Sequence, residues 1–218
     1  TLSPSSAASD VYKRQIQDRP VLYYSLKEFE DSAVDEIVLV VGKGEEEFCR
    51  REIVDKYGIS KVKAIVEGGK ERYHSVFEGL KQTSDADYVL IHDGARPFVN
   101  QDIIRRCMQE VQKYQACVVG MPVKDTIKIA DEEGYAKQTP DRKNVWMIQT
   151  PQTFSYALIY EAYEEMLKTE DTAITDDAMV LERIKGKKSK LIEGSYRNIK
   201  ITTPEDLLIA NVYLQHPE

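Results

Sequence analysis

Apolar positions along the chain follow two alternating patterns, which predict a succession of strands and helices. Short, continuous apolar runs are typical of strands covered on both faces of a sheet. Such runs occur at residues 36–41, 62–66, 88–91 and 117–121. Between them, apolar residues recur at helical spacing and predict helices at residues 44–57, 70–82 and 101–115, preceded by one behind Pro20. Because strands alternate with helices, the sequence predicts an α/β fold with a mostly parallel sheet flanked by helices.

The pattern changes after Pro122, where two strand-like stretches flank a turn. The stretches are residues 123–130 and 135–139, and Asp-Glu-Glu-Gly lies between them at 131–134. This arrangement predicts a β-hairpin arm, about residues 122–145, that leaves the main sheet. The remaining pattern predicts helices at 155–168 and 175–185, strands at 190–192 and 198–202, and a last helix opened by the capping sequence Thr203-Pro204-Glu205-Asp206.

The composition is that of a globular protein, and the net charge and hydropathy argue against nucleic-acid and membrane partners. The 218 residues suit one large α/β domain or two small ones, and no internal repeat or linker divides them. A net charge of −7 argues against a protein that tracks nucleic-acid backbones, although local basic residues can bind a small phosphate ligand. No run approaches the ~18 apolar residues of a membrane span, so no membrane partner is expected. The cysteines, Cys49, Cys107 and Cys117, are odd in number and lack metal-type spacing, which favours reduced thiols and a cytoplasmic location.

Polar residues cluster after one of the early predicted strands, at the edge where an open parallel sheet binds its ligands. After residues 62–66 come Gly68 and Gly69, which let a backbone approach a ligand closely. Arg72 and Ser75 follow, three positions apart on one helix face. The simpler alternative for this stretch is a plain strand-to-helix turn.

A second polar cluster, His92-Asp93-Gly94-Ala95-Arg96-Pro97, follows residues 88–91. Asp93 stands at a strand end, where a carboxylate is well placed to hold Mg2+ between phosphate oxygens. Arg96 can fork onto a phosphate. The alternatives are an aspartate that caps the next turn and an arginine in solvent, and His92 is expected to be a packing residue rather than a base.

Further basic and hydroxyl residues lie on the arm and near the C-terminus. Lys124, Thr126 and Lys128 share one face of the arm, because side chains alternate along a strand, and this face either meets a ligand or is solvated. Lys200 lies inside an otherwise apolar predicted strand, so it is either on a solvated face or aimed at an anion. Thr175-Asp176-Asp177 is a good helix N-cap, and capping could be its entire role.

Taken in order along the chain, these patterns resemble the 2-C-methyl-D-erythritol 4-phosphate cytidylyltransferase family over about residues 20–215. The matching residues are Gly68-Gly69 with Arg72 and Ser75-Val76; His92-Asp93 with Ala95-Arg96-Pro97; Pro122-Val123-Lys124-Asp125-Thr126; Asp141-Arg142 with Trp146; Thr150-Pro151-Gln152 with Phe154; Thr175-Asp176; Asn198-Ile199-Lys200-Ile201-Thr202; and Pro204-Glu205-Asp206-Leu207. The resemblance implies a Rossmann-like nucleotidyltransferase fold and a homodimer joined by the arm. It also implies cytidylyl transfer from CTP to methylerythritol phosphate, with Mg2+, in the non-mevalonate isoprenoid pathway.

The resemblance further implies roles for individual residues. Asp93 would lie near Mg2+ and, with Lys200 and Arg142, would be catalytic, Lys200 touching the α-phosphate as it becomes five-coordinate. The residues implied to bind CTP are Gly69, Ser75, Asp93, Gly94 and Lys200. Those implied to hold methylerythritol phosphate are Arg96, Thr126, Arg142, Thr150 and Thr175, with the arm residues reaching into the partner subunit.

The chain departs from the family at its start. Family members begin with a strand and a glycine-rich loop of the type Ala-Ala-Gly-x-Gly-x-Arg, whose N–H groups cradle the triphosphate. Residues 1–19 contain no glycine and match neither element. We therefore expect residues 1–15 to be a foreign or disordered tail, and residues 16–218 to be a single cytidylyltransferase domain without its first strand and loop. Two neighbouring strands would then have unpaired edges.

Three other functions have to be weighed. A ribitol-5-phosphate cytidylyltransferase would share most of these motifs. A catalytically impaired, dimeric sugar-phosphate-binding module would explain the absent loop, but it would not need Asp93, Arg96, Arg142 and Lys200. A nicotinamide-binding Rossmann domain is disfavoured, because no G-x-G-x-x-G follows a first strand.

Overall fold

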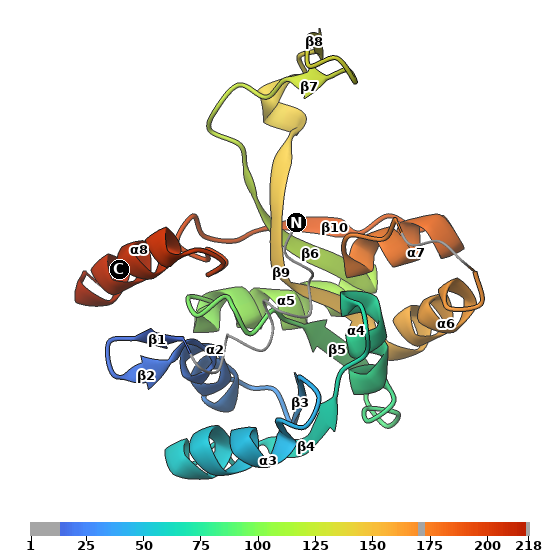
Figure 1. Cartoon of the computed structure of the whole chain (residues 1–218). Coiled ribbons are helices and arrows are strands. Elements are labelled where there is room, and N and C mark those ends of the chain that lie inside the picture. The colour runs from blue at the N-terminus through green and yellow to red at the C-terminus, as the bar shows by residue number, and fades with distance from the viewer. Residues whose placement is uncertain (1–13, 170–172, 217–218) are drawn as a thin grey trace.

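Helices and strands alternate through most of the chain, and a long arm projects from them (Figure 1). The computed structural model describes residues 14–169 and 173–216, so most of the expected tail, residues 1–13, lies outside the described residues. The helices are α2 (Val21–Glu30), α3 (Glu46–Cys49), α4 (Arg72–Leu80), α5 (Gln101–Tyr114), α6 (Tyr156–Met166), α7 (Asp177–Lys185) and α8 (Pro204–Gln215). The strands are β1 (Gln15–Ile16), β2 (Arg19–Pro20), β3 (Ile37–Val41), β4 (Val62–Glu67), β5 (Tyr88–Ile91), β6 (Ala116–Pro122), β7 (Ile129–Ala130), β8 (Ala136–Gln138), β9 (Trp146–Ser155) and β10 (Lys190–Glu193).

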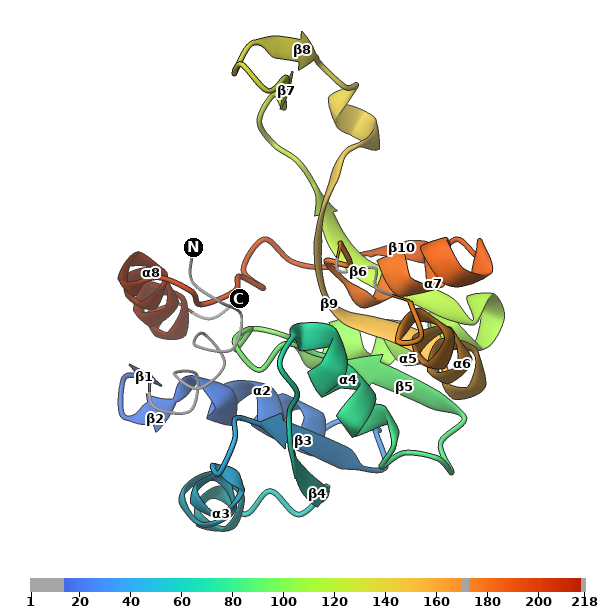
Figure 2. The same ribbon diagram turned by 45° about the vertical axis from the view of Figure 1, so that its right-hand side comes forward.

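The main sheet has four strands in the order β10-β6-β9-β5. β10 pairs parallel with β6, whereas β9 pairs antiparallel with both β6 and β5. It follows that β5, β6 and β10 run in one direction and only β9 runs against them, in agreement with a mostly parallel sheet. β3 and β4 form a separate parallel pair (Figure 2).

Helices cover both faces of the main sheet, which explains why β6 is a continuous apolar run. Ala116 and Val118 belong to the buried cluster that contains α6 and α7. Cys117 and Val119 belong to the cluster of α5 on the opposite face. Because successive side chains point to opposite faces, burial of both faces removes any polar alternation.

The predicted hairpin arm is present, with shorter strands than the pattern suggested. The chain leaves the sheet from β6 and returns along β9, and only β7 and β8 pair near the tip, before a short 3-10 turn at Arg142–Asn144 (Figure 1). The tip packs on no sheet of its own subunit, so its apolar side chains stay exposed, Tyr135 to 70%. Without a covering layer, a two-stranded ribbon keeps few ladder bonds.

Two predictions about secondary structure need correction. Residues 198–202 do not form a strand; they are an extended segment joined to the turn after β5 by a hydrogen bond from the Ile201 N–H to the Ala95 carbonyl (2.8 Å). The helix expected over 44–57 is α3 continued by a π-helical turn at Arg50–Asp55, and it ends at Gly58, whose φ of +64° suits glycine. The capping box that opens α8 from Thr203 is confirmed.

The two sheets are separate because β3 and β5 each have one partner among the described strands. β3 pairs only with β4, and β5 pairs only with β9. β4 and β5 nevertheless end close together, since Arg72, just after β4, contacts Asp93, just after β5.

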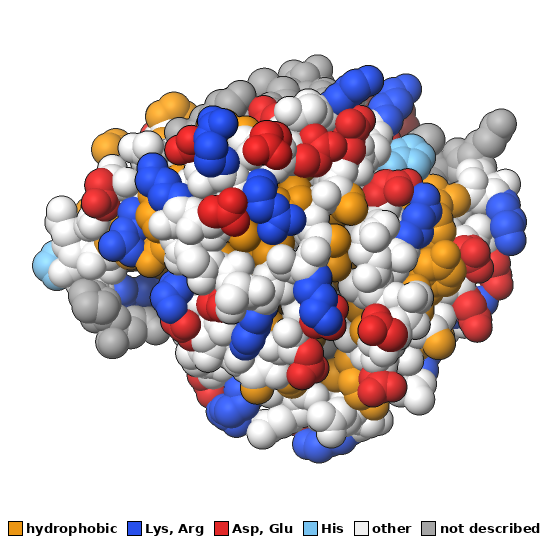
Figure 3. All heavy atoms as spheres, turned by 90° about the horizontal axis from the view of Figure 1, so that it is seen from below, with side chains coloured by type: hydrophobic (Ala, Val, Ile, Leu, Met, Phe, Trp, Pro, Cys, Tyr) orange, Lys and Arg blue, Asp and Glu red, His pale blue; other side chains and the backbone are white. Residues whose placement is uncertain are grey.

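The surface opposite the arm carries acidic and basic side chains side by side, without a field of one sign (Figure 3). In the described part of the chain, no helix combines the length and apolar character that crossing a membrane requires.

Candidate active site

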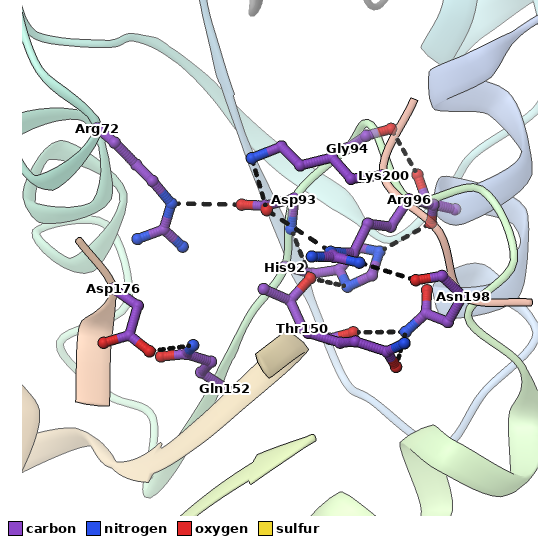
Figure 4. Close-up of polar contacts among 12 residues, drawn as sticks. Arg72, His92, Asp93, Gly94, Arg96, Thr150, Gln152, Asp176, Asn198 and Lys200 are labelled. Carbon is purple, nitrogen blue, oxygen red and sulfur yellow. Dashed lines mark hydrogen bonds and ion pairs between the residues drawn. The ribbon is translucent and has the colours of Figure 1, made fainter. Parts of the chain in front are cut away.

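One carboxylate surrounded by basic side chains lies where β4 and β5 end (Figure 4). The Asp93 Oδ2 atom is 3.0 Å from Lys200 Nζ and 3.7 Å from Arg96 Nε, and its Oδ1 atom is 3.3 Å from Arg72 Nε. The Asp93 side chain is only 16% exposed. The turn after β5, the start of α4 and the segment before α8 each contribute a charged group, so distant parts of the sequence meet here.

The charges at this site are unbalanced. Burial opposes ionisation of Asp93, but Arg72, Lys200 and Arg96 together hold its pKa well below the usual range. The carboxylate therefore stays ionised beside three basic groups, of which Arg72 is shared with Asp177. One positive charge is left in excess at this partly dry sheet edge, where it is suited to attracting phosphate groups.

Arg72 is the most firmly fixed of the three basic residues. Its Nη1 and Nη2 atoms donate to the two oxygens of Asp177 at 2.9 and 2.7 Å, and Asp177 is fully buried. The Tyr163 hydroxyl donates to the same carboxylate at 2.6 Å. Although burial opposes the charge of Arg72, Asp177 and Asp93 outweigh it and raise the pKa of Arg72 well above its ordinary value. Arg72 thus joins α4, α7 and the turn after β5.

Arg96 and Lys200 retain more donor capacity. Arg96 Nη1 donates to the carbonyl of Asn198 at 2.8 Å, whereas its buried Nε makes no hydrogen bond. Burial lowers the pKa of Arg96, and Asp93 partly opposes that effect. The Lys200 side chain is 42% exposed and has Asp93 as its ion-pair partner. These two side chains can turn toward an incoming anion.

Two polar side chains, His92 and Thr150, lie beneath the charged residues. His92 is partly buried, and desolvation lowers its pKa to about 4. Its ring contacts Phe29 at 5.2 Å between centroids, and its nitrogens bond to Arg96 and Thr150, so it is a packing and hydrogen-bonding residue, as the sequence suggested. Thr150 is 3% exposed, and its hydroxyl lies under the turn.

The paired glycines meet a steric requirement. A Cβ atom on Gly69 would stand 2.3 Å from the Cβ of His74, and one on Gly68 would stand 2.6 Å from the Ser75 hydroxyl. The Gly69 N–H donates to that hydroxyl at 3.1 Å. The turn between β4 and α4 therefore folds tightly onto the helix start, and Glu71 and His74 cap it reciprocally.

The structure gathers some of the expected site residues and leaves others apart within one subunit. Asp93, Gly94, Arg96, Thr150 and Lys200 lie together (Figure 4). Gly69 and Ser75 bond to each other at the turn before α4, the helix that begins with Arg72. Thr126 and Arg142 are exposed on the arm, where Arg142 Nη1 donates to the Lys124 carbonyl. Thr175 is exposed, and it is Asp176 that caps α7, accepting from the Met179 N–H at 2.9 Å.

Arg72, Asn198 and Asp177 belong to the site but were not among its expected residues. The sequence could have identified Arg72 as a site residue, since Arg72 stands three residues after Gly69 at the start of a helix. Asn198 is fully buried and holds Arg96 through its carbonyl, but its sequence position resembles any turn. Asp177 looked like a capping residue, because nothing in the sequence reveals that it meets Arg72 across the site.

Asp93 fits one ligand position of a magnesium ion. No group of three His, Cys, Asp or Glu side chains in residues 14–169 and 173–216 is arranged to hold a metal by itself. Magnesium is commonly bound by one or two carboxylates, with substrate phosphates and water completing the shell. The donor set is therefore that of a metal held largely by a nucleotide.

A family model and individual relatives of known sequence match the chain and indicate the same family. A model of the 2-C-methyl-D-erythritol 4-phosphate cytidylyltransferase family matches residues 7–216. Proteins of that name from Lachnospira eligens and Lachnoclostridium phytofermentans are 52% and 48% identical to the chain over 203 and 200 residues. Each alignment covers 92% of this chain. It covers 89% of the length of the Lachnospira protein and 86% of the length of the Lachnoclostridium protein.

Solved structures agree with the sequence comparison. The crystal structure of a 4-diphosphocytidyl-2C-methyl-D-erythritol synthase from Anaerococcus prevotii has a TM-score of 0.87 and 37% identity, covering 96% of this chain and 93% of its own. A 2-C-methyl-D-erythritol 4-phosphate cytidylyltransferase from Thermus thermophilus has a TM-score of 0.79 and 30% identity, and the match covers 98% of this chain and 96% of the Thermus chain. The expected nucleotidyltransferase fold is thereby confirmed.

Proposed function

The chain belongs to the 2-C-methyl-D-erythritol 4-phosphate cytidylyltransferase family, and on that premise we propose that the cluster around Asp93 carries cytidylyl transfer. CTP and methylerythritol phosphate give 4-diphosphocytidyl-2-C-methyl-D-erythritol and pyrophosphate. The observation that supports this role is the excess of basic groups around one buried carboxylate, with Lys200 and Arg96 able to turn toward an anion.

The chemistry requires charge control rather than a strong base. The attacking atom is a phosphate oxygen that is already ionised at neutral pH. The site has to bring two anions together and to stabilise the charge that develops on the α-phosphoryl group. Lys200 is assigned to that group, because its ammonium, which lies 3.0 Å from Asp93 Oδ2, needs only to exchange that carboxylate for a phosphoryl oxygen.

Arg96 is assigned to the phosphate of methylerythritol phosphate. Its Nη1 anchors the guanidinium to Asn198 and its buried Nε faces Asp93, so its positive charge is held in place beside the position proposed for the phosphate. Gly69, Ser75 and Gly94 are assigned to CTP, since they line the turns on either side of Asp93.

The arm is assigned to the dimer. Thr126, Arg142 and the exposed Tyr135 have no core of their own subunit to pack on, so we infer that they meet a second copy of the chain. In that arrangement Thr126 and Arg142 complete the acceptor pocket of the partner, and Thr175 lines its margin. The buried free cysteines are in keeping with a cytoplasmic protein.

Mg2+ is the proposed cofactor, with Asp93 as its protein ligand. When bound, the ion neutralises phosphate charge and polarises phosphoryl oxygens. Arg72 keeps Asp93 oriented from the side opposite Lys200, while Lys200 is free to leave the carboxylate.

An impaired, dimeric sugar-phosphate-binding module is a second candidate, because the basic groups around Asp93 could hold a phosphate without carrying the transfer. Calorimetry with CTP and Mg2+ separates the two, because the module would bind methylerythritol phosphate but not the nucleotide.

The proposed function is tested with purified protein, CTP, Mg2+ and either methylerythritol phosphate or ribitol 5-phosphate. We expect cytidylylated product from the first acceptor only. Preference for ribitol 5-phosphate would instead assign the chain to the related ribitol reaction.

A further inference from the structure

Below the charged cluster, one imidazole and one hydroxyl join two backbone groups in a chain of hydrogen bonds. His92 Nε2 lies 3.1 Å from the carbonyl oxygen of Arg96. His92 Nδ1 lies 2.9 Å from the Thr150 hydroxyl, and the Asp93 N–H donates to that hydroxyl at 3.1 Å. Figure 4 shows these contacts beneath Asp93 and Arg96.

The partners determine where each proton lies. A carbonyl oxygen only accepts, so His92 Nε2 carries the hydrogen and donates to Arg96. The Asp93 N–H only donates, so the Thr150 oxygen accepts from it. The Thr150 hydroxyl keeps its own proton to donate, and His92 Nδ1, 2.9 Å away, accepts it. Each bond fixes the direction of the next, and only one tautomer of His92 satisfies the whole set.

This set of bonds holds both ends of the turn that carries the charged groups. At one end the Thr150 hydroxyl holds the Asp93 N–H, and at the other His92 holds the Arg96 carbonyl. The Arg96 N–H bonds to the Asp93 carbonyl at 2.9 Å and closes the turn between them. A single imidazole–hydroxyl pair therefore sets the positions of a carboxylate and a guanidinium of opposite charge.

Thr150 also reaches the segment that carries Lys200. Its carbonyl accepts from Asn198 Nδ2 at 2.9 Å, and the Asn198 carbonyl accepts from Arg96. In β9, Thr150 lies at a bulge, between the residues that pair with β5 and β6 and those that pair with β6 alone. Thr150 is thus a shared attachment point for the turn after β5 and the 198–202 segment.

We propose that His92 and Thr150 are positioning residues, which act together through the Nε2–H tautomer to fix Asp93 and Arg96 for the transfer step. This inference rests on the proposed function for its kinetic consequences, but not for its geometry. It gives Thr150 a different role from the substrate contact implied by family resemblance. The side chain is 3% exposed, and its hydroxyl already donates to His92 and accepts from Asp93.

The kinetic test compares Thr150→Val, Thr150→Ser and Thr153→Val. Valine has the shape of threonine but lacks the hydroxyl, whereas serine retains it. Thr153 is the matched control, because it is a buried threonine of the same strand whose hydroxyl makes no hydrogen bond. Thr150→Val should lower kcat about 10- to 100-fold with the KM for methylerythritol phosphate changed less than about threefold, since misplaced groups slow the reaction without removing a substrate contact. Thr150→Ser and Thr153→Val should stay within about threefold of the wild type in kcat.

A mainly raised KM in Thr150→Val would contradict the positioning role and restore the substrate contact. An unchanged kcat in that variant would contradict it as well.

A second measurement does not depend on activity. Nitrogen-15 NMR of His92, whose signals are identified by their loss in His92→Gln, should show a protonated Nε2 and an unprotonated Nδ1 at neutral pH. The Asp93 amide should exchange with solvent faster in Thr150→Val than in the wild type, but not in Thr150→Ser. An Nδ1–H tautomer, or equal exchange in all three proteins, would overturn the inference. If the wild type turned over no CTP, the proposed function would fail while this test still decided the geometry.

Discussion

Asp177→Asn should be among the most destabilising single changes at the site, although Asp177 is assigned no contact with substrate. The carboxylate is fully buried, accepts two bonds from Arg72 and a third from the Tyr163 hydroxyl. Asparagine has the same shape and keeps an oxygen for Tyr163, so the substitution removes little besides the negative charge. Arg72 is then left with Asp93 as its only carboxylate partner, at 3.3 Å.

The size of the effect follows from burial. Breaking a buried ion pair by removing one partner costs about 3–5 kcal/mol, because an uncompensated charge stays in a dry site. Arg72 keeps 29% of its side chain exposed and keeps Asp93, so the lower end, about 3 kcal/mol, is expected. For a chain of this length that corresponds to a fall of about 6–12 °C in Tm.

Urea unfolding followed by circular dichroism measures the loss, provided that the m-value is unchanged. Asp176→Asn is the matched control, since it removes the neighbouring charge from an N-cap where asparagine caps equally well, and it should cost less than about 1 kcal/mol. Combining Arg72→Met with Asp177→Asn should cost less than the sum of the two single changes, because no buried charge is then left without its partner. Equal stability of the Asp177→Asn and Asp176→Asn proteins would refute the reasoning.

Three further predictions concern metal binding, acid stability and assembly. Lys200→Met should bind free Mn2+ more tightly than the wild type in a calorimetric titration, because Nζ no longer competes for Asp93 Oδ2 at 3.0 Å, and equal affinities would contradict the proposed exchange. Burial raises the pKa of Asp206, but the hydrogen bonds it accepts from Thr202 and Thr203 together outweigh burial and lower it. The stabilisation that these bonds give is therefore complete above pH 3.8, the ordinary pKa, and is lost as the pH falls through the lower folded pKa. Asp206→Asn should abolish that part of the acid dependence in urea titrations, and an unchanged pH profile would contradict the prediction. Tyr135→Lys on the exposed arm should convert dimers to monomers in sedimentation, whereas Tyr88→Lys, at an exposed tyrosine away from the arm, should not; a wild-type monomer would end the proposal.

The fold was predictable wherever burial imposes a period on the sequence. β6 is apolar throughout because α6 and α7 cover one face and α5 the other, and the α8 cap is a local pattern that needs no tertiary information. The 198–202 segment was mistaken for a strand, because its apolar residues pack against a turn instead of a ladder.

The site was predictable only in part, because local spacing identifies charged groups but not their partners. Asp93 and Arg96 stand at a strand end, where the fold places ligands, so their position could be predicted. The Arg72–Asp177 pair joins residues 105 positions apart, and no periodicity connects them. The bond from Thr150 to His92 likewise depends on the register of β9 against β5.

The most direct test of the central claim is the rate at which 4-diphosphocytidyl-2-C-methyl-D-erythritol forms from CTP, methylerythritol phosphate and Mg2+, in the wild type, Lys200→Ala and Lys190→Ala. Lys190 is an exposed lysine of β10 that lies over the Tyr114 ring, away from Asp93, and serves as the control. The account predicts that loss of the Lys200 ammonium slows product formation on the order of 10²-fold or more, while Lys190→Ala keeps the wild-type rate. Product formation by Lys200→Ala at the wild-type rate would contradict it.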